Sequence, residues 1–114
     1  MSAVLDKSAV ADDESLISDD RDIEFASHSL KAMAHPLRLK ILCLLGRTTE
    51  VSVHEIVEYV GTSQSNISQH LSILRDKGIL ASRRDANKVF YRIGEPKILE
   101  LISVMRNAFC SRPA

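Results

Sequence analysis

The apolar and polar positions of residues 62–78 repeat with the period of a helix. Ile67, Leu71 and Leu74 are four and three residues apart, so they form one narrow apolar stripe. The other positions are mostly Ser and Gln and carry almost no charge before Arg75. Amides and hydroxyls both donate and accept hydrogen bonds, as reading base edges in a major groove requires. The pattern predicts a DNA-recognition helix; the alternative is a surface helix that is merely rich in Ser and Gln.

Local signals delimit this helix and indicate its reading side chains. Thr62 or Ser63 can cap the first turn, and Gly78 can end the last one. The polar side chains lie on the face opposite the apolar stripe, where they are free to meet DNA. The side chains predicted to contact bases or phosphates are Gln64, Ser65, Ser68 and Gln69.

Apolar spacing predicts three helices upstream, at residues 19–34, 36–45 and 53–59. A His-Pro step separates the first two, because the residue before a proline disfavours helix. Ser52 and the Glu three residues later can form a capping box that begins the third helix. Gly61 then makes a sharp turn. The order of helix, glycine turn and polar-faced helix predicts a helix-turn-helix.

After Gly78 the period changes from helical to two. Residues 79–84 and 88–93 alternate as strands around turn residues 85–87, which predicts a β-hairpin. A basic hairpin directly after a recognition helix predicts a winged helix, with its cations along the DNA phosphates. The alternative is a hairpin whose charges only aid solubility. The predicted phosphate contacts are Arg83, Arg84 and Lys88.

Residues 96–109 predict a last helix, whose apolar surface is too wide for one small domain to cover. The helix at 19–34 is also apolar on one side, and two such terminal helices predict a homodimer. A dimer places its recognition helices about 34–36 Å apart and suits an inverted-repeat operator. The expected fold class is mainly α with a β-hairpin wing: a homodimeric winged helix-turn-helix of four helices, two strands and a fifth helix.

The net charge of the 114 residues is zero, but it is unevenly divided. Residues 1–24 hold eight Asp and Glu against two Lys and Arg, a net charge of −6. Residues 25–114 hold thirteen Lys and Arg against seven Asp and Glu, a net charge of +6. The basic part suits double-stranded DNA as a partner.

These totals predict one domain with tails. We expect a flexible acidic tail at residues 1–18, a DNA-binding and dimerisation domain at 19–110, and a short tail at 111–114. The acidic tail either competes with DNA for the basic surface or only solubilises the chain. The sequence shows neither a signal peptide nor a run long enough to span a membrane, so a cytoplasmic location without a membrane partner is expected.

Three stretches carry a family resemblance: LKAMAHPLR at residues 30–38, SQSNISQHL at 63–71 and RRDANKVFY at 83–91. They are similar to the ArsR/SmtB family of bacterial winged-helix repressors, and the likeness covers about residues 20–110. The resemblance implies a homodimer that represses transcription and releases DNA when an inducer binds. It also adds Asn66 and His70 to the predicted DNA contacts.

The resemblance narrows the choice of inducer. Metal-sensing members of the family typically carry Cys-x-Cys before the recognition helix, or paired Asp/His and His/Glu ligands on the last helix. Residues 51–56 of this chain hold no thiol, and residues 96–109 hold one carboxylate, Glu100. No metal site and no cofactor are therefore predicted.

Cys43 and Cys110 are the two cysteines of the chain. In position and context they resemble the dithiol of the reactive-sulfur-sensing branch of this family. That resemblance implies that the two thiols lie close together and become bridged by a disulfide or a polysulfide when reactive sulfur acts as the inducer. Judged without the resemblance, Cys43 is equally a small buried hydrophobe and Cys110 an idle thiol near the end of the chain.

Other functions stay open beside this one. The same cysteines could serve a repressor that responds to a thiophilic metal or metalloid, although a third ligand is not evident. An enzyme is not expected, since the chain has no Cys-x-x-Cys, catalytic cluster or phosphate loop. A winged helix used only for contacts with other proteins is the third alternative.

Overall fold

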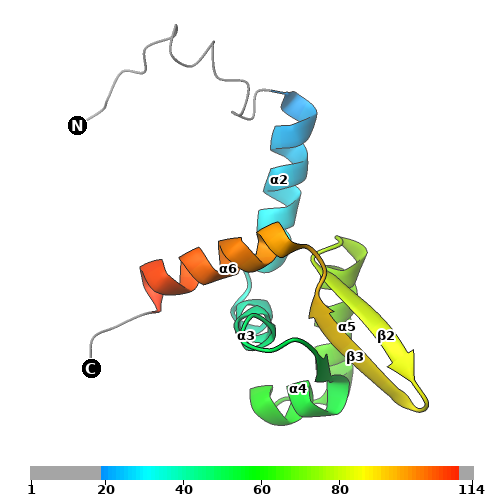
Figure 1. Cartoon of the computed structure of the whole chain (residues 1–114). Coiled ribbons are helices and arrows are strands. Elements are labelled where there is room, and N and C mark those ends of the chain that lie inside the picture. The colour runs from blue at the N-terminus through cyan, green and yellow to red at the C-terminus, as the bar shows by residue number, and fades with distance from the viewer. Residues whose placement is uncertain (1–18, 111–114) are drawn as a thin grey trace, which may run out of the picture.

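Residues 19–110, the part of the chain that the computed structural model describes, form a winged helix (Figure 1). The predicted helices are confirmed, and their ends differ from the prediction by at most two residues. The predicted tails at 1–18 and 111–114 lie outside the described residues. The elements are α2 (Asp20–Met33), α3 (Pro36–Leu45), β1 (Val51–Ser52), α4 (Val53–Val60), α5 (Gln64–Asp76), β2 (Leu80–Asp85), β3 (Lys88–Ile93) and α6 (Pro96–Phe109).

Side chains at the N-caps determine where the helices begin. The Ser52 hydroxyl accepts a hydrogen bond from the Glu55 amide at 3.1 Å, and the Glu55 carboxylate accepts one from the Ser52 amide at 3.0 Å, which confirms the predicted capping box. Of the two candidate caps for α5, the structure selects Ser63, whose hydroxyl accepts from the Asn66 amide at 3.2 Å. These bonds satisfy amides that the first helical turn leaves unpaired.

Two glycines permit the turns at either end of α5. Gly61, between α4 and α5, has φ of 82°, and Gly78, between α5 and β2, has φ of 76°. Both values lie in the left-handed region, where a Cβ atom would be strained. The sharp turn predicted at Gly61 is therefore confirmed, and it sets the angle between the two helices of the helix-turn-helix.

The apolar stripe of α5 is the centre of the core. Ile67, Leu71 and Leu74 are fully buried, with an exposed fraction of 0% each. They pack with Ile41 and Leu42 of α3 and with apolar residues from every other described element. The polar face of α5 is consequently held outward by the burial of its opposite face, which couples the reading surface to the stability of the core.

The sheet contains one strand that the sequence analysis missed. β1 pairs antiparallel with β3, so the strand order is β1-β3-β2, and Val51 lies opposite Tyr91. The hairpin itself is confirmed, but its turn is one residue shorter than predicted, because Asp85 pairs with Lys88. Ala86, in this turn, has φ of 56°. β1 joins the base of the wing to the start of α4, so the wing is not a free-standing hairpin.

Large apolar side chains remain exposed on the first and last helices. Figure 1 shows α2 and α6 crossing on the side of the molecule opposite α4 and the tip of the hairpin. An apolar cavity of about 230 Å³ lies between α2, α3 and α6. The large apolar side chains of these two helices that are more than 40% exposed are Ile23, Phe25, Leu30, Leu99, Leu101, Val104 and Phe109.

Candidate nucleic-acid interface

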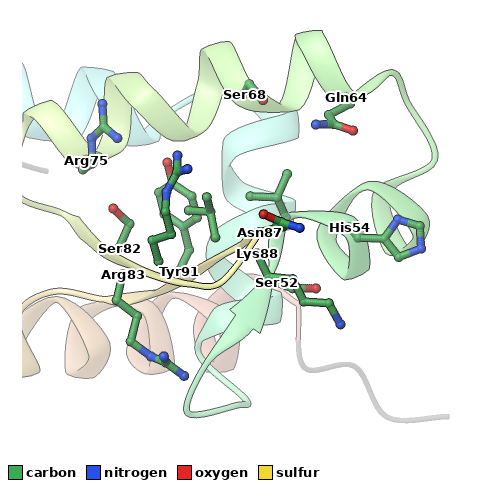
Figure 2. Close-up of a pocket in the computed structure, with 13 residues that line it drawn as sticks. Ser52, His54, Gln64, Ser68, Arg75, Ser82, Arg83, Asn87, Lys88 and Tyr91 are labelled. Atoms are coloured by element: carbon green, nitrogen blue, oxygen red, sulfur yellow. The ribbon is translucent and has the colours of Figure 1, made fainter.

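A polar groove of about 540 Å³ lies between α5 and the wing. Gln64, Ser68 and Arg75 line it from α5, where spacings of four and seven residues place them on one flank of the helix. The strands line the other side. In Figure 2 the side chain of Ser82 points toward the helix that carries these three residues, whereas Arg83 points away from it. The groove is thus bounded by two surfaces that can both donate hydrogen bonds.

The predicted reading side chains of α5 fall into two groups. Gln64, Ser65, Ser68 and Gln69 are exposed and available to a partner. Asn66 is half-buried, and its side-chain amide donates to the hydroxyl of Thr62 at 3.3 Å, so it is engaged at the start of the helix. The structure therefore brings the first group together on an outward face and holds Asn66 beside it.

His70 connects α5 to the helices behind it. Its Nδ1 accepts a hydrogen bond from Nε of Arg38 at 3.0 Å, and Arg38 also donates to the carbonyl of Ala32, the penultimate residue of α2, at 2.9 Å. The His70 ring lies 4.7 Å from the ring of His35, centroid to centroid. Burial lowers the pKa of His70, and the charges of His35 and Arg38 lower it further. The neutral imidazole is favoured, as its acceptor role requires.

The three predicted cations of the wing do not share one environment. Arg83 and Arg84 are neighbours on β2, so they lie on opposite faces of the sheet. Arg84 shares the face of Ser82, toward α5, whereas Lys88 pairs with Asp85 and shares the face of Arg83; all three cations line the edge of the groove. Within residues 19–110, neither Arg84 nor Lys88 has an acidic partner within 4 Å, so their charges are available to phosphate.

Arg83 is already paired. Its Nε and Nη2 each donate to a carboxylate oxygen of Glu50 at 2.7 Å, and its guanidinium lies 4.7 Å from the centre of the Phe90 ring. The hydrogen bonds from Arg83 hold the pKa of Glu50 below its ordinary value. A two-pronged arginine–carboxylate pair of this length is the strong form of the interaction.

The groove also includes residues that the sequence analysis did not assign. His54 of α4, Ser82 of β2 and Asn87 in the hairpin turn line it, and Arg75 completes its α5 flank. Helical spacing from Gln64 would have indicated Arg75, and the alternation of β2 would have paired Ser82 with Arg84. The position of His54 depends on how α4 packs, which no local pattern reveals.

The two thiols lie on α3 and at the end of α6, and neither lines this groove. Cys43 is half-buried on α3, and Cys110 is exposed at the end of α6; both are free thiols. Burial raises the pKa of the Cys43 thiol, and the negative charge of Cys110 raises it further, against the opposing effect of Arg106 and Arg47. The charge of Cys110 thus acts on Cys43, which lies on a helix in contact with α6.

Residues 19–110 contain no group of three or more His, Cys, Asp or Glu side chains placed to hold a metal ion. In the same part of the chain, none of the helices combines the length and apolar character needed to cross a membrane.

Known proteins resemble this chain in sequence. The family model for bacterial regulatory proteins of the arsR family matches residues 35–82. The Escherichia coli HTH-type transcriptional regulator YgaV is 40% identical over 87 residues, which cover 76% of this chain and 88% of YgaV. This chain belongs to the ArsR family.

Other ArsR-family relatives agree in sequence and in fold. The biofilm growth-associated repressor of Xylella fastidiosa is 37% identical over 83 residues, covering 73% of this chain and 72% of the repressor. The solved structure of HlyU from Vibrio cholerae has a TM-score of 0.77 at 35% identity and covers 82% of this chain and 100% of HlyU. The ArsR-family relatives are DNA-binding regulators of transcription rather than enzymes, and this chain is a regulator of the same kind.

Proposed function

We propose that this ArsR-family regulator is a homodimeric repressor that releases an inverted-repeat operator when Cys43 and Cys110 are bridged by reactive sulfur. The observation that supports the sensing part is the contact between α3, which carries Cys43, and α6, which ends at Cys110; the charge of Cys110 also raises the pKa of Cys43. Two thiols on contacting helices that connect the core with the exposed apolar face suit a covalent switch. A relative supports the idea, since one solved structure is described as reduced HlyU from Vibrio cholerae.

The DNA-binding half of the proposal uses the groove and the outward face of α5. The exposed amides and hydroxyls of α5 read base edges in the major groove, and Arg84 and Lys88 contact phosphates beside it. Dimerisation through α2 and α6 covers their exposed apolar side chains and places the second α5 one DNA turn away. A symmetric dimer requires an operator with two inverted half-sites.

The sensing chemistry begins at the more exposed sulfur. The Cys110 thiolate attacks the outer sulfur of a persulfide donor; the S–S bond of the donor breaks, its thiolate leaves, and Cys110 becomes a persulfide. The Cys43 thiolate then attacks the inner sulfur of that persulfide and expels hydrosulfide, which forms a Cys43–Cys110 disulfide. The protein loses two electrons, and the transferred sulfur is reduced to sulfide. Burial suits Cys43 to the second step, because its raised pKa keeps it a poor first nucleophile.

The Cys43–Cys110 disulfide lowers the affinity for DNA through its effect on the proposed dimer. It ties the end of α6 to α3, and α6 also carries exposed apolar residues of the proposed dimer interface. A shift of α6 therefore changes the spacing of the two reading helices. A loss of affinity of about 100-fold needs only about 2.7 kcal/mol of difference between the two states, which one covalent link can supply.

Replacement of each cysteine tests the mechanism. Cys43→Ser should bind a duplex, selected from a random pool by the wild-type protein, with unchanged affinity, and a persulfide donor should no longer release it. Cys110→Ser is the matched variant for the first step, and intact mass should show a sulfur adduct on Cys43→Ser but none on Cys110→Ser. Release of Cys43→Ser by the donor would overturn the sensing mechanism and leave the DNA-binding proposal standing.

A thiophilic metal is the second candidate inducer. A relative from Streptomyces lividans, 41% identical over 76 residues, is described as a probable mercury resistance operon repressor. Two neighbouring thiolates could hold Hg²⁺, a soft ion that accepts two sulfur ligands. Native mass spectrometry separates the candidates: retained mercury together with release of DNA favours the metal, whereas the loss of two hydrogens after persulfide treatment favours the bridge.

A further inference from the structure

The pairing of Arg83 with Glu50 separates it from the other cations of the wing. Nε and Nη2 of Arg83 both reach Glu50, and Asp85 lies 3.9 Å from Nη1. The side chains of Glu50 and Arg83 are 25% and 49% exposed. A guanidinium paired through two hydrogen bonds with one carboxylate adds little net charge toward a phosphate.

This contact crosses the whole sheet. Arg83 lies on the edge strand β2, its cross-strand neighbour Phe90 lies on the central strand β3, and Glu50 precedes the far strand β1. The guanidinium passes over the Phe90 ring before it reaches the carboxylate. The pair therefore fastens the strand that carries Arg84 to the loop that connects α3 with β1.

The direction of the Arg83 side chain also separates it from Arg84. Figure 2 shows Arg83 on the side of the strands away from Gln64 and Ser68, whereas Ser82 points toward them. A wing that lies along the DNA with its α5 side presents Arg84, whereas Arg83 lies on the other face of the sheet, where Glu50 holds it. The Arg83 side chain would have to leave Glu50 to contact a phosphate.

From this geometry we propose that Arg83 and Glu50 form a positioning pair, which fixes the angle of the wing against α4 and α5, and that Arg83 makes no phosphate contact. The inference rests on the use of the wing in DNA binding proposed above and revises the role predicted for Arg83. Holding the hairpin in its bound orientation before DNA arrives lowers the entropic cost of binding.

Exchange of the two charges distinguishes positioning from contact. The double replacement Glu50→Arg with Arg83→Glu keeps the net charge and can remake the pair in reverse. Positioning predicts that this variant binds the selected duplex within about threefold of wild type and with the same salt dependence. A phosphate contact predicts that it is the weakest variant, because it places a carboxylate against DNA.

A neutral pair covers the case in which the reversed pair fails to form. Glu50→Gln with Arg83→Gln also keeps the net charge, and positioning predicts roughly a threefold to tenfold loss of affinity with an unchanged salt slope. A slope reduced by about one unit would overturn the inference, because it would count one lost phosphate contact. Thermal unfolding of each variant confirms that it is folded.

Arg84→Gln is the matched control on the same strand. It should lower affinity on all duplexes alike and reduce the salt slope by about one unit. If Arg84→Gln has no effect, the use of the wing fails; if it has this effect while the Glu50 and Arg83 pair behaves as a phosphate contact, only the present inference fails.

Discussion

The two sides of this molecule differ in how far a single chain buries their apolar side chains. On the side of α5, the apolar stripe of the helix is fully buried by residues of the same chain, and polar groups face outward. On the side of α2 and α6, large apolar side chains stay exposed, Phe109 at 76% and Phe25 at 67%. A single chain therefore completes the reading surface but leaves the opposite surface unfinished.

This difference indicates that the two sides of the molecule have different functions. Side chains that read DNA need fixed positions, and a packed core supplies them without help from a second chain. In the proposed dimer, the distance between the two reading helices is set elsewhere, at the surface of α2 and α6. A signal that acts on α6 can change this distance and leave each reading helix intact. Three measurements test this division.

The first prediction concerns the completed side. Leu71→Ala should destabilise the chain by roughly 2–5 kcal/mol, because it removes a fully buried side chain and leaves a cavity beside the stripe. Chemical denaturation followed by circular dichroism measures the change. Gln69→Ala, on the exposed face of the same helix, is the control and should change stability by less than about 0.5 kcal/mol. Equal effects at both positions would contradict the packing described here.

The second prediction concerns the unfinished side. Val104→Asp should leave the fold intact and separate the dimer, because residue 104 is 64% exposed on α6 and a carboxylate there resists burial by a partner. Sedimentation should show a monomer, and affinity for the selected duplex should fall by about 100-fold or more, since the second reading helix is no longer linked. Ile73→Asp, on α5, is the control at an apolar position outside α2 and α6, 37% exposed, and should leave the sedimentation unchanged. A dimer that survives Val104→Asp would remove α6 from the interface.

The third prediction uses pH. The folded state lowers the pKa of His70, so the unfolded chain takes up its proton more readily, and acidification favours unfolding. The contribution of His70 is fully present above its ordinary pKa of about 6.5 and is lost as pH falls through the lowered folded-state value. The melting temperature should fall more steeply below that pH for the wild type than for His70→Gln, which keeps an acceptor but does not titrate. Parallel pH profiles would show that the Arg38 bond does not depend on the charge of His70.

Local signals explain why the helices and the hairpin could be predicted. The capping box at Ser52 and the left-handed turn at Gly61 depend on residues within one turn of chain, so the sequence displays them directly. Strand β1 was missed because two residues carry no readable period. It exists through pairing with β3, about forty positions later in the chain, and such pairing is visible only after folding.

The sequence predicts the candidate interface with the same limit, since contacts between distant positions are not visible in it. The sequence indicates which residues of α5 face outward, since burial of Ile67, Leu71 and Leu74 decides it. It treats Arg83 and Arg84 as equivalent tip cations, although a period of two already places them on opposite faces. The pairing of Arg83 with Glu50 spans 33 positions, and that of Arg38 with His70 spans 32. No local pattern records either bond.

The length and attachment of α6 have a mechanical consequence. Its fourteen residues make a rod about 21 Å long, with Cys110 at one end and the central strand β3 two residues before the other. The attached end is held tightly, because a Cβ added at Gly94 would lie 3.1 Å from the carbonyl oxygen of Gly78. The rod is held a second time at Ile102, which is buried near its middle. A pull of about 2 Å at the sulfur therefore acts on the arm of about 12 Å beyond Ile102 and turns the end of the helix by roughly 10°.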